Sequence, residues 1–175
     1  MSNHTLLTIG AFLILSTILL GFYQLLAATG DQLTDSQDLI LATTISESYI
    51  ELAQGLAFDQ LTDTSNVAIG NPSALTTIDL LGRDGTGETS IPTFSDFDDF
   101  NRFTVEQIAT GTNKRFTTTF RVYYVNPNDL SSVSTTQTFV KRLDLKTWRS
   151  YPPSASGASV DTVRISSVLG YFHFD

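Results

Sequence analysis

The amino-acid sequence predicts an α+β fold in which a long N-terminal α-helix, hydrophobic in its first half and amphipathic in its second, packs on a C-terminal antiparallel β-sheet. Three observations predict this fold. A charge-free apolar run extends from Thr5 to Gly30, helical periodicity follows it, and short alternating segments separated by turn residues occupy the rest of the chain. We therefore divide the 175 residues into a hydrophobic helix (1–30), an amphipathic helical stem (31–62) and a β-rich head (63–175).

The apolar run is long enough to cross a membrane as a helix, which needs about 20 apolar residues. A secretory signal cleaved after Ala28 is the alternative. The run lacks the basic residues that precede such a signal and exceeds the roughly 7–15 residues of its apolar part. We expect the segment to enter the membrane and later to form the core of an assembly. The large side chains expected in that core are Leu6, Leu7, Ile9, Phe12, Leu13, Ile14, Leu15, Ile18, Leu19, Leu20, Phe22, Leu25 and Leu26.

The stem carries an apolar stripe at helical spacing. Its members are Leu41, Ile45, Tyr49, Leu52 and Leu56, and we expect this face to pack on the sheet of the head. The first proline of the chain is Pro72, so the sequence predicts a nearly continuous helix from Leu6 to about Leu61, with Gly30 as a possible joint. The small residues Ala42, Ser46, Ala53, Gly55 and Ala57 permit close approach of another element.

Charge is unevenly distributed along the chain. The first 82 residues contain eight acidic side chains and no Lys or Arg, whereas the remainder contains ten of each sign. This asymmetry allows the stem of one copy to dock on the head of another, although a solvated acidic helix explains it equally well. Nucleic-acid binding by the stem is disfavoured because it has no cations to neutralise phosphates.

Alternating segments predict the strands of the head. Residues 116–125 alternate aromatic or aliphatic side chains with polar ones, and residues 138–147 place Phe139, Lys141, Leu143 and Leu145 on one face. Val163 and Ile165 indicate a further strand. A small sheet needs a cover for its apolar face, and the stem is the natural candidate.

The densest set of oxygen ligands consists of Asp96, Asp98, Asp99 and Asn101, which calcium could use. The alternative is a turn in which the aspartates cap backbone N–H groups while Phe94, Phe97, Phe100 and Phe103 anchor it to the core. No other cofactor is indicated. The two histidines, His4 and His173, offer no set of nucleophile, base and orienting acid, so we expect no enzyme activity.

Four short motifs add a family resemblance: Ala57-Phe58-Asp59, Phe97-Asp98-Asp99-Phe100-Asn101, Phe120-Arg121-Val122-Tyr123-Tyr124-Val125 and Phe139-Val140-Lys141-Arg142-Leu143. In this order, behind an apolar helix, they resemble the type IV pilin superfamily of bacterial pilins and pseudopilins, and within it the minor pilins of mannose-sensitive haemagglutinin type. The chain departs from that family in two ways. It lacks the prepilin cleavage motif with its glutamate, and Arg102 stands where those proteins tend to have glycine.

The resemblance implies a structural subunit of an extracellular pilus-like filament at the bacterial cell surface. The chain would be inserted in the inner membrane and then assemble as a helical homo-oligomer through its hydrophobic helices. A minor pilin or pseudopilin that assists assembly, and a membrane-anchored binding domain that never polymerises, are the alternatives. The sequence identifies neither a surface ligand nor the role of the filament in adhesion, motility or DNA uptake.

Overall fold

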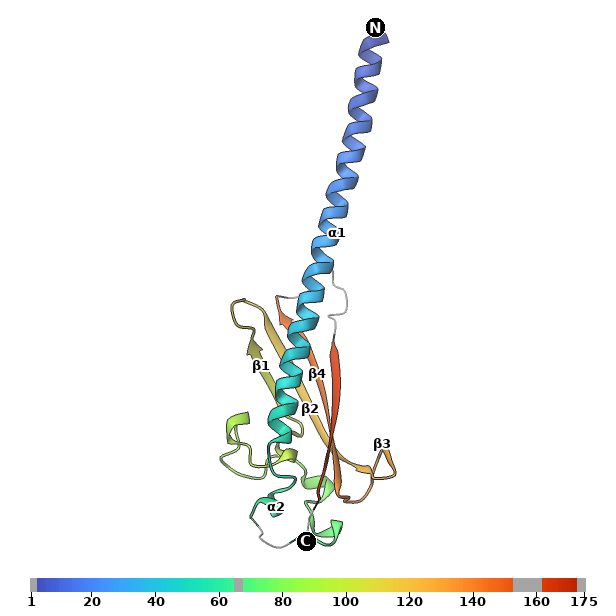
Figure 1. Ribbon diagram of the computed structural model, residues 1–175. Helices are drawn as coiled ribbons and strands as arrows, with labels where there is room; N and C mark the ends of the chain where they lie inside the picture. Colours follow the sequence, from blue (N-terminus) through green and yellow to red (C-terminus); the bar gives the residue numbers. More distant parts are fainter. Residues whose placement is uncertain (1–2, 65–67, 153–161, 173–175) are drawn as a thin grey trace. The chain divides into compact units, whose positions relative to one another are not determined.

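The computed structural model describes residues 3–64, 68–152 and 162–172, and the chain forms two compact units, Met1–Asp38 and Leu39–Asp175. The helix α1 (Asn3–Gln54) supplies all of the described part of the first unit and continues into the second (Figure 1). The division falls inside the segment predicted as the stem. The fold is α+β, as predicted from the sequence, with an N-terminal helix packed on an antiparallel sheet.

Serine and threonine hydroxyl groups of the first unit donate to carbonyl oxygens within α1 itself. Thr8, Ser16 and Thr29 each donate to the carbonyl oxygen four residues earlier, at 2.8 Å. Such internal bonds remove the cost of placing a hydroxyl in an apolar environment. The polar residues of the apolar run are therefore compatible with a membrane or a protein core around it.

The helix ends earlier than the sequence predicted. It stops at Gln54, before Gly55, and a separate short helix α2 (Gln60–Thr64) follows. Glycine is unfavourable in a helix interior. In addition, the chain at Ala57 pairs with the head, where the N–H of Phe97 donates to the Ala57 carbonyl at 2.9 Å. This tertiary contact replaces the last helical turns expected up to Leu61.

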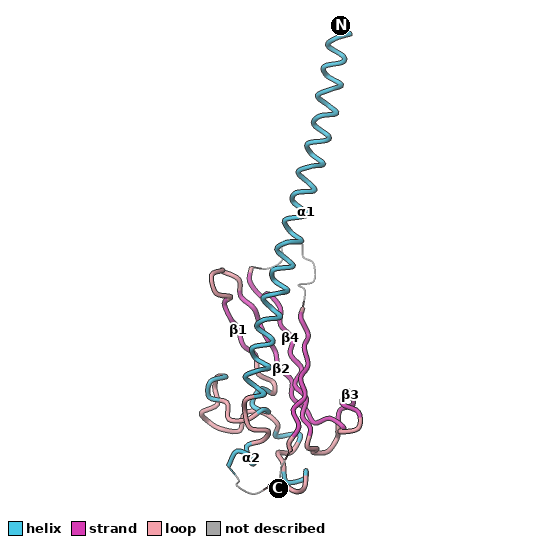
Figure 2. Tube along the Cα trace, in the orientation of Figure 1, coloured by secondary structure: helices cyan, strands magenta, loops and turns pink. Residues whose placement is uncertain are grey.

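The sheet of the second unit has five antiparallel strands in the order β1-β2-β4-β5, with β3 paired to β2 (Figure 2). The strands are β1 (Thr104–Ile108), β2 (Arg115–Asn126), β3 (Asp129–Val133), β4 (Val140–Tyr151) and β5 (Val163–Gly170). Four short 3-10 helices precede them: Pro72–Ala74, Ile78–Leu80, Ile91–Thr93 and Phe97–Phe100. The predicted strands correspond to β2, β4 and β5, whereas β1 and β3 were not predicted.

One face of the sheet is covered by the segment of α1 from Leu39 to Gln54. Ser46 Oγ donates to Thr147 Oγ1 at 2.7 Å, Tyr49 Oη donates to Gln107 at 2.9 Å, and the rings of Tyr49 and Phe120 meet edge to face at 5.3 Å. The main core lies between these two layers. Its buried hydrophobic members are Ala42, Ile45, Tyr49, Ala53, Phe94, Phe97, Phe100, Ala109, Phe116, Phe120, Val122, Leu143 and Leu145.

The buried face of the helix overlaps the predicted stripe but excludes Leu52. Of the predicted residues, Ile45 and Tyr49 are buried and Leu41 and Leu56 are partly buried against the core, but Leu52 is 53% exposed. The centre of the contact is formed by Ala42, Ser46 and Ala53, all at most 2% exposed. Small side chains let the helix approach the sheet closely, so the helix packs on the sheet through this face and the larger Leu52 stays at the surface.

Two substitutions at neighbouring positions test this orientation. We expect Ala53→Leu to lower the free energy of unfolding by about 1–3 kcal/mol, because the added atoms meet a fully packed helix–sheet contact. Leu52→Ala should change the free energy of unfolding by less than about 0.5 kcal/mol, because the side chain is exposed. Urea unfolding of the detergent-solubilised chain, followed by the fluorescence of the single tryptophan, Trp148, measures both. The opposite ranking would contradict this orientation.

Candidate functional site

A buried ion cluster joins three distant parts of the head. Lys141, which is 0% exposed, points from β4 into the interior, and its Nζ donates to Asp59 Oδ2 at 3.0 Å, to the Phe58 carbonyl at 2.8 Å and to Asp98 Oδ1. The Nζ also lies 4.7 Å from the centre of the Phe58 ring and 5.3 Å from that of Tyr124. The ammonium group is thus neutralised and shielded on all its donor sites.

The four motifs that carry the family resemblance meet at this lysine, which Tyr124 reaches from β2. Phe58 and Asp59 belong to the segment after α1, Asp98 belongs to the 3-10 helix Phe97–Phe100, and Lys141 takes an inward position of β4. The alternation along β4 placed Lys141 on the core face but gave no information about its partners. The sequence analysis therefore found each member of the cluster without predicting that they touch.

The lysine controls the ionisation of its carboxylate partner. Burial by itself opposes the charged form of Asp59, but the charge of Lys141 and hydrogen bonds from Lys141, the Thr76 N–H and the Leu61 N–H outweigh it, so the pKa of Asp59 is lowered. Burial and the nearby Asp59 and Asp98 raise the pKa of Tyr124, whose hydroxyl donates to the Thr76 carbonyl at 2.8 Å. The cluster ties the segment after α1 and the 3-10 helix Phe97–Phe100 to strand β4.

The aspartate turn beside this cluster is a capping structure. Asp96 Oδ1 accepts from the N–H groups of Asp98 (2.9 Å) and Asp99 (3.3 Å), and Asp99 Oδ2 accepts from those of Ser95 (2.8 Å) and Asp96 (3.2 Å). Asn101 donates to the Leu81 carbonyl and accepts from the Val122 N–H. The aromatic anchors Phe94, Phe97 and Phe100 are buried, and Phe103 is partly buried against the core.

The four residues of the calcium prediction are held in separate hydrogen bonds. Asp96, Asp98, Asp99 and Asn101 do not form one ligand set, because their side chains are directed at separate backbone groups and, for Asp98, at Lys141. A different group, Asp84, Glu88 and Asp99, places carboxylate oxygens within 4.8 Å of one another. Asp99 Oδ1 is buried without a hydrogen-bond partner among the described residues. These three residues could hold a divalent cation, and sequence reasoning missed Asp84 and Glu88 because they lie in a glycine-rich loop.

Burial and neighbouring carboxylates raise two pKa values in the turn. Burial, followed by the charges of Asp98 and Asp99, raises the pKa of Asp96 from 3.8 to about 8. Burial, opposed by backbone hydrogen bonds and assisted by the charge of Glu88, raises that of Asp99 to about 6. Both groups therefore bind a proton more tightly in the folded chain than in the unfolded chain.

The stability of the head should consequently decrease at alkaline pH. A raised carboxyl pKa stabilises the fold fully below the unfolded value, and this contribution is lost as the pH rises through the folded values near 6 and 8. We expect the free energy of unfolding to fall by at least about 2 kcal/mol between about pH 5 and about pH 9. Asp96→Asn keeps a capping acceptor and should flatten the profile. A stability that is constant or higher at pH 9 would contradict these shifts.

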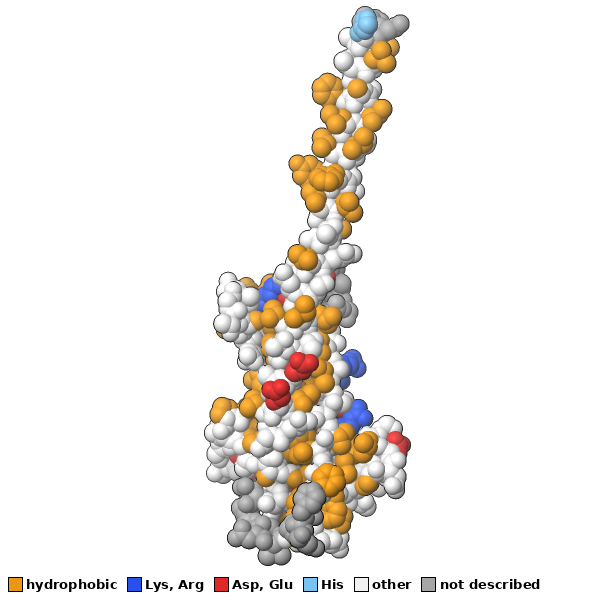
Figure 3. Space-filling view, in the orientation of Figure 1, with side chains coloured by type: hydrophobic (Ala, Val, Ile, Leu, Met, Phe, Trp, Pro, Cys, Tyr) orange, Lys and Arg blue, Asp and Glu red, His pale blue; other side chains and the backbone are white. Residues whose placement is uncertain are grey.

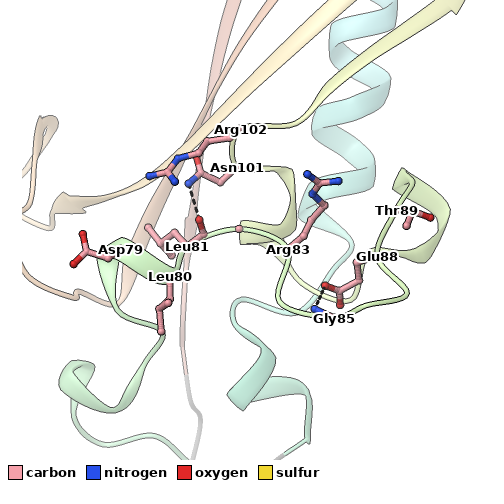
Figure 4. A pocket seen from close by; sticks show the side chains of 10 residues that line it. Asp79, Leu80, Leu81, Arg83, Gly85, Glu88, Thr89, Asn101 and Arg102 are labelled. Atoms are coloured by element: carbon pink, nitrogen blue, oxygen red, sulfur yellow. Dashed lines mark hydrogen bonds between the residues drawn. The ribbon is translucent and has the colours of Figure 1, made fainter.

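A shallow pocket lies next to the carboxylate group (Figure 4). Arg83, Glu88 and Arg102 line it, with the backbone of Leu80, Leu81 and Gly82, and one Glu88 oxygen accepts from the Gly85 N–H at 2.8 Å. Arg102 has a left-handed backbone (φ 60°), which favours glycine. The lining residues carry charges of both signs.

The other candidate site is the apolar surface of the first unit. All thirteen residues predicted as the assembly core have exposed side chains, from 48% for Leu19 to 70% for Leu7. Figure 3 shows these hydrophobic side chains gathered along the N-terminal part of α1. This helix is long and apolar enough to cross a membrane, and none of its most apolar part is buried inside the described structure. The surface indicates membrane insertion or secretion, and it is equally compatible with a filament core.

Comparison with protein-family models, with curated proteins and with solved structures gives no match. The architecture itself, a long apolar N-terminal helix whose second part packs on an antiparallel sheet, is pilin-like. No family match supports the finer assignment to minor pilins.

Proposed function

We propose that this chain is a structural subunit of an extracellular pilus-like filament whose core is built from its N-terminal helices. The observation that carries the proposal is the apolar surface of residues 6–26. Burying it against neighbouring copies is favourable by about 25 cal/mol for each Å² removed from water, so a helical bundle of these segments gains many kcal/mol per subunit.

The pilin-like architecture supports a filament over an isolated membrane anchor. The head needs nothing from the first unit for its core, because that core lies between the sheet and the segment from Leu39 onward. The first unit is therefore available for assembly. Before assembly, the same apolar segment would hold the subunit in the inner membrane, with the head outside.

A membrane-anchored domain that does not polymerise is the second candidate, since a single apolar helix suffices for an anchor. Shearing of native cells, followed by sedimentation, separates the two candidates. A filament subunit should appear in the sheared, sedimenting fraction in many copies, whereas an anchored domain should remain with the membranes and dissolve in mild detergent as a monomer. Recovery of a few copies within filaments of another protein would show a minor subunit.

A further inference from the structure

We propose that the outer face of the sheet binds the outward face of the stem helix of a second copy of this chain, through complementary charge. This inference rests on the proposed filament, and it assigns one of the contacts between subunits. Its two surfaces are the basic stripe, formed by Arg121, Lys146 and Arg164, and the acidic face of the stem, formed by Glu47 and Glu51.

The basic stripe crosses three strands on the face that α1 leaves uncovered. Arg121 on β2 follows the inward-facing Phe120, and Lys146 on β4 lies between the buried Leu145 and Thr147. Arg164 on β5 is paired in register with Lys146. Because side chains alternate along a strand, all three cations point away from the helix, and all three are exposed.

The stripe is not balanced by acidic side chains within the described residues, although the Arg121 guanidinium lies over the Tyr123 ring, 5.1 Å from its centre. Lys146 and Arg164 are directly opposite each other, and like charges in cross-strand pairs destabilise a sheet. Asp144 lies opposite Arg121, but its Oδ1 already accepts from Arg142 (2.8 Å) and Ser166 (2.7 Å), and its Oδ2 accepts from the Tyr123 hydroxyl (2.8 Å). The described residues give no ion pair to any of the three stripe cations. A bound anionic surface would remove this repulsion.

The acidic face of the stem has the matching properties. Glu47 and Glu51 lie one helical turn apart, both are exposed, and neither makes an ion pair within the described residues. The side of the helix toward the sheet is occupied by Ser46 and Tyr49, so the two glutamates point outward. The first 82 residues supply no Lys or Arg that could neutralise them.

The positions of the two surfaces favour an open assembly. Within the second unit, the helix covers one face of the sheet, so its acidic face and the basic stripe are directed to opposite sides. A contact between different surfaces of identical subunits is heterologous, and it produces a filament when its rotation does not close a ring. One subunit can therefore accept the stem of a neighbour while its own stem is accepted by the next.

Charge reversal in the full chain tests the contact. We expect Lys146→Glu with Arg164→Glu, and separately Glu47→Lys with Glu51→Lys, each to reduce the chain in the sheared filament fraction at least about tenfold, because like charges then meet. The four substitutions together should restore it to within about threefold of wild type. In Lys146→Glu with Arg164→Glu, two like charges still face each other across the strands, as they do in the wild type. We therefore expect the urea midpoint of the head to stay unchanged, which would show that the fold is intact. Arg83→Glu with Arg102→Glu changes the net charge equally and should leave the yield unchanged.

The outcomes separate this contact from the filament itself. Suppose that the wild-type chain forms filaments. If neither double substitution then lowers the filament yield, or if both lower it and the fourfold variant does not recover it, the proposed contact is wrong although the filament exists. Binding of DNA or another polyanion to the stripe, with normal filament yield in the head variant, would also overturn it. The absence of any wild-type filament would instead remove the proposed function.

Discussion

Lys141→Met is expected to lower the free energy of unfolding of the head by about 3–5 kcal/mol, a large part of the stability of an ordinary domain. Methionine has a similar length and is apolar, so the loss would not come from a cavity. It would come from the carboxyl groups of Asp59 and Asp98, which are at most 2% exposed and would remain buried without their cation. Urea unfolding followed by Trp148 fluorescence measures the change.

Two further variants show whether charge is the cause. Lys141→Met combined with Asp59→Asn and Asp98→Asn removes the whole ion cluster, and it should recover most of the lost stability because no buried charge remains unpaired. Arg142, at the neighbouring position, pairs with Asp144, and its side chain is 25% exposed. Arg142→Met should therefore lower the free energy of unfolding by less than about 1 kcal/mol. Equal losses for Lys141→Met and Arg142→Met would show that the buried cluster is not critical.

Ile14→Lys should abolish filament assembly. The side chain is 64% exposed in the isolated chain and lies in the middle of the apolar surface that we propose to be the filament core. A lysine at the centre of an apolar environment costs about 2.5–3.5 kcal/mol per subunit. Since 1.4 kcal/mol corresponds to a factor of ten and every copy carries the substitution, the filament yield should fall at least about a hundredfold.

A matched variant in the same helix controls for the added charge. Ser36→Lys places the same side chain at an exposed polar position beyond the apolar run, and the yield should stay within about threefold of wild type. Neither variant should change the urea midpoint of the head, because both positions belong to the first unit. Wild-type filament yield from Ile14→Lys would mean that this surface is not buried in the filament.

Periodicity predicted the elements whose stability depends on a single apolar face. The long helix and the strands β2, β4 and β5 repeat their apolar residues at helical or alternating spacing. The strand β1 was missed because its residues, such as Thr104 and Glu106, are mostly exposed and lack alternation. The extent of α1 was overestimated since the pairing of Ala57 with the head, a contact between distant segments, has no local signal.

Of the two candidate sites, the apolar surface could be predicted from local sequence and the ion cluster could not. The apolar surface of residues 6–26 is a local property, so the sequence predicted it completely. The ion cluster depends on contacts across 82 residues between Lys141 and Asp59 and across 43 residues between Lys141 and Asp98, and composition gives no pairing information over such separations. Neighbouring oxygen ligands in the sequence likewise need not share one site: Asp96 and Asp99 accept from different backbone N–H groups, and Asp98 accepts from Lys141.

Cryo-electron microscopy of filaments sheared from native cells tests directly whether this chain builds a filament. We expect a helical reconstruction in which this chain fits the repeating density, with residues 6–26 of every copy packed at the axis and the sheets outside. Filaments built from another protein, with this chain found only as a monomer in the membrane, would contradict it.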